Sequence, residues 1–192
     1  MKEILMVAGP NGARKTTMTL ELISNLPMFY EFINADEIAK ALAPLHPETV
    51  ALTASKLMIK RMKELVHANK NFTFETTASG LNYIKHIKAA QLQGYEITLT
   101  FLWLSSPNEA VKRVAERVKQ GGHNVPKEII IKRYYTGLKN LLTHCFPLAD
   151  NVSIMDNSSE RASERLIAKK SANGSIDIYN KVIWEKLQKA AK

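Results

Sequence analysis

Residues 9–17 read Gly-Pro-Asn-Gly-Ala-Arg-Lys-Thr-Thr, and they constrain this chain more than any other segment. They follow an apolar run at residues 3–8, which predicts a buried strand, and they lead directly into a helical stretch. Glycines, a lysine and a hydroxyl residue between a strand and a helix are typical of a loop whose backbone N–H groups cradle phosphate. A parallel sheet flanked by helices is an architecture that carries such a loop.

This loop is predicted to bind a nucleotide through its backbone and two of its side chains. Lys15 is expected to reach the β- and γ-phosphates, and the hydroxyl of Thr16 is expected to ligate Mg²⁺. ATP and Mg²⁺ are therefore the expected cofactors. The predicted nucleotide-binding residues of the loop are Gly9, Asn11, Gly12, Ala13, Arg14, Lys15, Thr16 and Thr17.

Arg14 occupies the position at which the pattern G-x-x-x-x-G-K-[ST] has its second glycine. A side chain there crowds a backbone that must lie close to phosphate. Three interpretations stay open. The guanidinium turns outward and is tolerated, it contacts phosphate itself, or the substitution weakens or abolishes nucleotide binding.

Short apolar or β-branched runs alternate with helical stretches, which predicts the α/β class and a P-loop NTPase-type three-layer fold with a mostly parallel central sheet. The predicted strands are residues 3–8, 29–34, 72–76, 95–104 and 152–155, and the predicted helices include 50–67, one capped by Ser106, and 127–142. The Asn-Gly pair at 173–174 predicts a C-terminal β-hairpin of 166–170 with 175–179, and an amphipathic helix follows it. We expect a single domain over residues 1–192.

Composition narrows the class of protein and of partner. A net charge of +9, from 27 basic and 18 acidic residues, favours acidic partners such as phosphates and nucleotides. The single cysteine, Cys145, excludes an intramolecular disulfide and a cysteine metal site, and we expect it to be packed in the core. With a single cysteine, a reducing, cytoplasmic compartment is the expected location. The apolar runs of the chain fall short of the roughly 20 residues that cross a bilayer, so we expect no membrane span.

Polar residues end the second and third predicted strands, at the edge of the sheet where ligands bind. Asp36 can accept the proton of an acceptor hydroxyl and orient that hydroxyl for attack, or it only caps the next helix. Glu75 either binds substrate or is satisfied by neighbouring donors. The predicted substrate-binding residues are Asn34, Asp36, Glu75, Thr76 and Thr77.

Paired glycines at residues 121–122 predict a loop between two helices, and we expect residues 117–133 to form a lid. Arginines on a closing lid can stabilise the negative charge of a phosphoryl group in transfer. The alternative is a solvated helix face on which Glu116 pairs with an arginine. The predicted catalytic residues are Lys15, Asp36, Arg117 and Arg133.

Five segments in order carry a resemblance to a known family. They are AGPNGA at 8–13, FINADEI at 32–38, FETT at 74–77, FLWL at 101–104 and RVKQGGHNVP at 117–126. Together they resemble the zeta toxin family of P-loop small-molecule kinases, in its short, stand-alone bacterial branch. The resemblance covers most of the chain, from Gly9 to about Ser158.

The resemblance implies ATP-dependent phosphorylation of a sugar nucleotide, typically at the 3′-hydroxyl of UDP-N-acetylglucosamine. It implies that Asp36 is the general base and that Glu75 with Thr77 contacts the sugar nucleotide. It also implies that Arg117 and Arg133 meet the γ-phosphate.

Asn157 is implied to border the adenine, and an antitoxin that blocks the nucleotide site is an implied partner. Because Arg14 departs from the family pattern, an attenuated kinase and a catalytically impaired nucleotide-binding regulator, or pseudokinase, are both open. A nucleic-acid end kinase is a further alternative, which the basic balance favours. We rank it lower, because no aromatic platform is interleaved with the basic residues.

Overall fold

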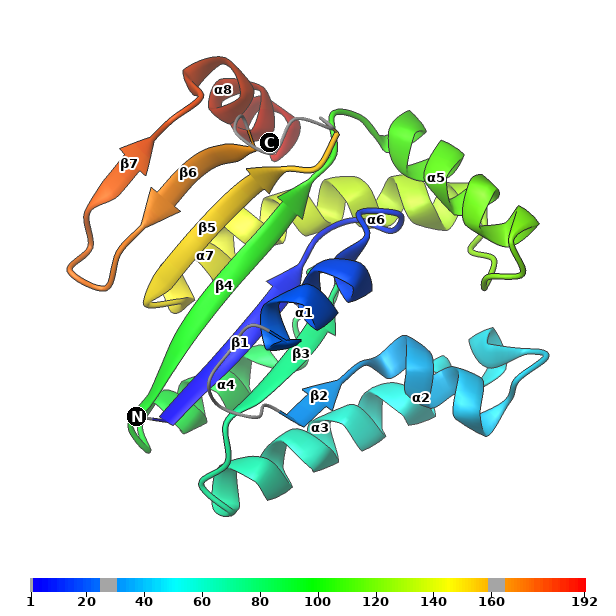
Figure 1. Ribbon diagram of the computed structural model, residues 1–192, viewed down its shortest axis with the longest axis horizontal. Coiled ribbons are helices and arrows are strands. Elements are labelled where there is room, and N and C mark those ends of the chain that lie inside the picture. The colour runs from blue at the N-terminus through cyan, green and yellow to red at the C-terminus, as the bar shows by residue number, and fades with distance from the viewer. Residues whose placement is uncertain (1, 25–30, 159–164) are drawn as a thin grey trace.

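A computed structural model describes residues 2–24, 31–158 and 165–192. Its centre is one seven-stranded sheet in the order β2-β3-β1-β4-β5-β6-β7 (Figure 1). The strands are β1 (Lys2–Ala8), β2 (Glu31–Ile33), β3 (Phe72–Thr76), β4 (Tyr95–Trp103), β5 (Asn151–Asp156), β6 (Leu166–Lys170) and β7 (Ile176–Ile178). The first five are parallel to one another, and β6 and β7 are antiparallel to their neighbours.

Helices cover both faces of this sheet, with α1 on one face and α4 and α6 on the other (Figure 1). The helices are α1 (Lys15–Ser24), α2 (Ala35–Leu42), α3 (Ala51–His67), α4 (Ile84–Gln91), α5 (Pro107–Lys119), α6 (Lys127–Asn140), α7 (Phe146–Leu148) and α8 (Lys181–Ala190), with a 3₁₀ turn η1 (Pro47–Val50) and a π-helical turn η2 (Leu141–Cys145). Ser106 caps α5 as predicted, because its hydroxyl accepts a hydrogen bond from the Glu109 backbone N–H at 3.2 Å. Pro107 then begins the helix, where it needs no donor.

The predicted three-layer, mostly parallel fold is confirmed, with local differences. The second strand, described from Glu31, ends at Ile33, one residue earlier than predicted, and the predicted strand residues Phe29 and Tyr30 lie outside the described residues. The helix predicted over 127–142 ends as an α-helix at Asn140 and continues as the π-helical turn η2. Cys145 is fully buried, as predicted.

The core follows from the place of each strand in the sheet. Central strands of a parallel sheet are covered on both faces, so they are apolar at nearly every position. In β1, Ile4 and Val7 are 0% exposed, and in β4 the same holds for Ile97 and Leu99. The chain runs from β1 to β2 toward one edge of the sheet, and from β3 to β4 toward the other edge. The neighbouring strands β1 and β3 therefore form a topological switch point, and the crevice at their carboxyl ends is where a ligand binds in such sheets.

Within the described parts of the chain, every helix is too short or too polar to cross a lipid bilayer.

Candidate active site

The loop between β1 and α1 is held in place by the ends of its neighbouring strands. The Gly9 backbone N–H donates to the Thr76 carbonyl of β3 at 3.2 Å. A Cβ at Gly9 would lie 2.5 Å from the carbonyl oxygen of Leu102 in β4, so only glycine fits this close approach. Behind the loop, the Asn157 side-chain amide donates to the Ala13 carbonyl at 2.7 Å. The structure thus gives Asn157 a bracing contact with the loop, and its predicted place beside adenine stays a prediction.

Arg14 has the backbone conformation that the motif assigns to glycine. Its φ is +56°, in the left-handed region, where a residue with a Cβ costs roughly 1 kcal/mol more than glycine. The side chain is exposed and lines the mouth of a cavity beside the loop. Exposure of the side chain fits an outward guanidinium, and its place on the cavity wall fits contact with phosphate, so the three interpretations of Arg14 stay open.

Lys15 begins α1 and turns back over the loop. Its Nζ donates to the carbonyl oxygens of Gly9 at 3.0 Å and Pro10 at 3.1 Å. Burial lowers the pKa of Lys15, and the carboxylates of Glu75 and Asp36 act in the opposite direction. The ammonium therefore lies between the loop and two acidic side chains.

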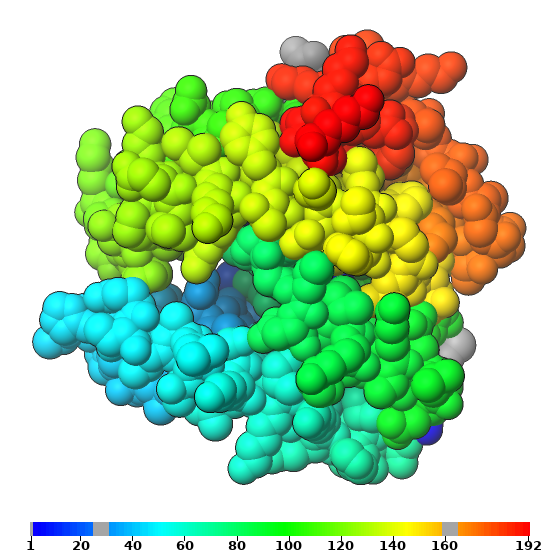
Figure 2. All heavy atoms as spheres, turned by 180° about the vertical axis from the view of Figure 1, so that it is seen from behind, coloured from blue at the N-terminus to red at the C-terminus, as the bar shows by residue number. Residues whose placement is uncertain are grey.

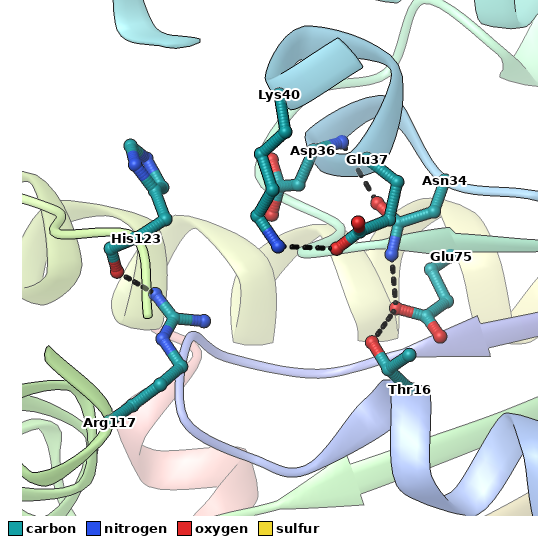
Figure 3. Close-up of polar contacts among 8 residues, drawn as sticks. All are labelled: Thr16, Asn34, Asp36, Glu37, Lys40, Glu75, Arg117 and His123. Carbon is teal, nitrogen blue, oxygen red and sulfur yellow. Dashed lines mark hydrogen bonds and ion pairs between the residues drawn. The ribbon is translucent and has the colours of Figure 1, made fainter. Parts of the chain in front are cut away.

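Glu75, at the carboxyl end of β3, joins the loop to the second strand (Figure 3). It is 6% exposed, and its Oε2 accepts hydrogen bonds from the Thr16 hydroxyl at 3.0 Å and the Asn34 amide at 2.9 Å. Its Oε1 has no hydrogen-bond partner among the described residues. Burial raises the pKa of Glu75, and the charge of Lys15 opposes that shift. Neighbouring donors thus satisfy one oxygen, and the other is unpaired.

Asp36 is not the cap of α2. The side chain of Asn34 accepts the hydrogen bond from the Asp36 backbone N–H at 2.8 Å, so Asn34 is the N-cap and the capping interpretation of Asp36 is wrong. The Asp36 carboxylate is exposed at the start of the helix. Figure 3 shows Asp36 with the neighbouring pair Glu37 and Lys40, whose side chains form an ion pair at 2.6 Å.

Two cavities meet at these residues. The smaller, of about 360 Å³, is lined by the loop and by α5, including Arg14, Thr16, Thr17, Arg113 and Arg117. The larger, of about 450 Å³, lies between α2, α3, the segment after β3, and α6. Figure 2 shows its hollow between the cyan surface of α2 and α3 and the yellow-green surface of α6. The residues that line both cavities are Lys15, Asn34, Asp36, Glu75 and His123.

The predicted lid loop wraps around Arg117, the last arginine of α5. The Arg117 Nη2 donates to the carbonyl oxygen of His123 at 2.6 Å, as Figure 3 shows, and the Gly122 backbone N–H donates to the Arg117 carbonyl at 2.9 Å. A Cβ at Gly122 would lie 2.5 Å from Cγ of Arg117. Arg133 of α6 lines the larger cavity, and Arg113 pairs with Glu109 at 2.7 Å. Arg117 and Arg133 therefore lie on opposite sides of the shared residues.

The predicted substrate residues after β3 lie in a tight turn. The Thr76 hydroxyl accepts a hydrogen bond from the Ala78 backbone N–H at 3.0 Å, and the hydroxyls of Thr77 and Ser79 are 2.8 Å apart. Thr76 and Thr77 both line the larger cavity. The structure thus brings every predicted substrate-binding residue to one edge of the sheet.

Sequence reasoning missed the buried amide that holds this turn. Asn140, at the end of α6, is 8% exposed, and its Nδ2 donates to the carbonyls of Ala78 at 2.8 Å and Ser79 at 3.2 Å. A polar residue among the apolar residues Leu138 and Leu141 is the signal that could have marked it. His123, in the predicted lid, also lines both cavities.

The described residues contain no cluster of three or more His, Cys, Asp or Glu side chains that could hold a metal ion. A Mg²⁺ site would instead draw on single oxygen ligands. Mg²⁺ prefers oxygen donors and is bound by one or two protein groups together with substrate phosphates. The Thr16 hydroxyl and the unpaired Oε1 of Glu75 supply donors of that kind beside the loop.

Comparison with known families agrees with this geometry. The family model described as zeta toxin matches residues 2–165. The chain belongs to the zeta toxin family. An uncharacterized protein of Haemophilus influenzae is 26% identical to this chain over 130 residues. The match covers 68% of this chain and 91% of the Haemophilus protein.

Solved structures with low sequence identity share the fold. The PezAT chromosomal toxin-antitoxin system of Streptococcus pneumoniae matches with a TM-score of 0.67 and 13% identity, over 99% of this chain and 84% of that one. The AvrRxo1-ORF1:AvrRxo1-ORF2 complex with sulphate ions matches with a TM-score of 0.73 and 14% identity, over 97% of this chain. This chain spans 63% of the length of that AvrRxo1 chain.

Proposed function

We propose that this zeta toxin family member transfers the γ-phosphoryl group of ATP to a hydroxyl group of a sugar nucleotide of the UDP-N-acetylglucosamine class. The observation that carries the proposal is the pair of cavities that meet at Lys15, Asp36 and Glu75. A kinase needs one site for the nucleotide, one for the acceptor, and a shared boundary at which the phosphoryl group passes.

Each residue at that boundary has a defined part in the reaction. The backbone N–H groups of the loop and the ammonium of Lys15 hold the β- and γ-phosphates. The Asp36 carboxylate accepts the proton of the acceptor hydroxyl as the oxygen forms its bond to phosphorus and the bond to the ADP oxygen breaks. Arg117 and Arg133 stabilise the negative charge on the phosphoryl oxygens from two sides.

Mg²⁺, when bound with ATP, would neutralise charge on the phosphate oxygens. Thr16 and Glu75 are the residues whose oxygens fit it. The Thr16 hydroxyl donates a hydrogen bond to Oε2 of Glu75 at 3.0 Å, so these two candidate oxygen ligands already lie side by side. One of the solved AvrRxo1 complexes with this fold contains ATP, which supports a nucleotide in the smaller cavity.

The larger cavity supports a polar acceptor. Its wall includes hydroxyl and amide side chains from α3 and from the segment between β3 and α4: Ser55, Thr77, Ser79 and Asn82. The Asn82 amide donates to the Ser55 hydroxyl at 2.6 Å, which joins α3 to the segment before α4. Sugar hydroxyls need such donors and acceptors around them. The PezAT relationship further supports an antitoxin protein as a partner.

An acceptor assay tests the proposal. Purified protein with ATP and Mg²⁺ is expected to release ADP at a rate that rises at least tenfold on addition of UDP-N-acetylglucosamine, measured by a coupled ADP assay. An oligonucleotide with a free 5′-hydroxyl is expected to give no rise. Faster turnover with the oligonucleotide than with the sugar nucleotide would instead support the nucleic-acid end kinase.

We further propose that Arg14 attenuates nucleotide binding. Arg14→Gly is expected to tighten ATP binding about tenfold, because it removes a Cβ from backbone that lies against phosphate, and to raise stability by about 1 kcal/mol, because it relieves the left-handed conformation. Calorimetric titration and thermal unfolding measure the two effects.

Arg14→Ala is the matched control, because it removes the charge and keeps both the Cβ and the strain. If Arg14→Gly and Arg14→Ala both weaken ATP binding, the guanidinium itself contacts phosphate and attenuation is excluded. If the parent chain shows no ATP binding and Arg14→Gly restores it, the chain is the pseudokinase.

A further inference from the structure

A third cavity, of about 250 Å³, lies between α3 and α4, away from the candidate active site. Its walls come from the last turns of α3, from α4, and from the first halves of β1 and β3. None of its lining residues lines the larger active-site cavity, to which α3 contributes the earlier residues Ala51, Ser55 and Met58.

The interior of this cavity is apolar. Ile4, Met62, Phe72, Ile87 and Ala90 line it, and each is at most 1% exposed. The volume equals that of about eight water molecules at roughly 30 Å³ each. Water in such a space would find few polar partners, so an apolar chain is the better occupant.

The rim of the cavity is basic, and Lys63 is its cation. The other polar lining residues are His67, His86 and Gln93, and no carboxylate lines the cavity among the described residues. The nearest acidic residue along α3, Glu64, is engaged with Arg61 at 3.2 Å. Burial, together with the nearby charges of Lys63 and Lys85, lowers the pKa of His86. An anion at this rim would offset the repulsion among these groups.

We propose that this cavity binds a small amphipathic anion, an alkyl chain that ends in a carboxylate or a phosphate. The alkyl chain lies in the apolar part of the cavity, against the accessible side chains of Val66 and Ala89, and the anionic head lies at Lys63 and His86. The site contains no residue of the proposed kinase reaction, so binding at this cavity can be tested independently of kinase activity.

Calorimetric titration with octanoate and octyl phosphate, below their micelle concentrations, tests the proposal. One saturable site is expected, and the tighter of the two probes identifies the head group. Octanol and octylammonium are expected to bind at least tenfold more weakly. Hexanoate is expected to bind about 15-fold more weakly than octanoate, because each buried methylene contributes a factor of about four.

Variants locate the site. Lys63→Glu is expected to weaken octanoate binding about tenfold, and Ala89→Phe, at the exposed edge of the cavity, is expected to abolish it. Lys60→Glu, an exposed lysine of the same helix outside the cavity, is the matched control and is expected to have no effect. Lys15→Ala is also expected to keep full affinity, which separates this site from the nucleotide cavity. Equal binding of octanol, unchanged binding in Lys63→Glu, or loss of binding in Lys15→Ala would each overturn the proposal.

Discussion

Asp36→Asn is expected to lower kcat for the acceptor-dependent reaction roughly 10³-fold. A positioned general base contributes about 10²–10⁴-fold to a rate, and asparagine keeps the shape of the side chain while it cannot accept the proton. The helix should survive the change, because Asn34 and not Asp36 provides the cap of α2. KM for ATP is expected to change by less than about threefold, because the loop and Lys15 hold the phosphates. Steady-state ADP release at varied ATP and acceptor measures both constants.

Asp177→Asn is the matched control for this variant. Asp177 is an exposed carboxylate of β7, the last strand of the sheet, so the same chemical change there should leave kcat as it was. Thermal unfolding of both variants checks that the fold is kept. A kcat for Asp36→Asn within threefold of the parent would remove Asp36 as the base and would require another carboxylate at the cavity boundary.

The sequence was enough to predict the elements whose identity depends on local pattern. β1 ends in the apolar run 4–8 and β4 in the apolar run 101–103, because helices cover both faces of these strands. The loop at residues 9–17 carries its own signal in glycine, lysine and threonine. The hairpin strand β6 falls on the predicted residues 166–170, because the Asn-Gly pair marks the turn between two short strands.

Contacts between distant segments could not be predicted in the same way. Asn140 reaches Ala78 across 62 positions, and Glu75 reaches Thr16 across 59 positions. The first pair depends on how α6 packs against the segment after β3, and the second depends on how α1 lies against β3. Nothing in the local pattern around either residue specifies its partner. Asp36 shows the same limit at short range, because both Asn34 and Asp36 are good N-cap residues and only the backbone geometry shows which one caps α2.

Arg117→Ala is also expected to lower kcat by roughly 10³-fold, since an arginine that meets the transferred phosphoryl group contributes about 10³–10⁵. Two features of the structure suit Arg117 to contact with the transferred phosphoryl group. Its Nη2 is anchored to the His123 carbonyl at 2.6 Å, and its Nε is buried with no hydrogen-bond partner among the described residues. A buried N–H donor without an acceptor is costly, and the oxygens of a bound phosphate would satisfy it. Single-turnover measurement of phosphoryl transfer separates this chemical step from product release.

Two further variants show whether position or charge is responsible. Arg117→Lys keeps the charge but lacks the planar fork, so it is expected to recover no more than about tenfold of the loss. Gly122→Ala does not change the arginine itself, but it puts a Cβ 2.5 Å from Cγ of Arg117. It should therefore displace the guanidinium and lower kcat about tenfold. Arg61→Ala, on the exposed side of α3, removes a comparable charge outside the active site and should leave kcat unchanged. If Gly122→Ala were as active as the parent, the turn at Gly121 and Gly122 would have no part in placing Arg117, and the arginine would have to be positioned by the phosphate it binds.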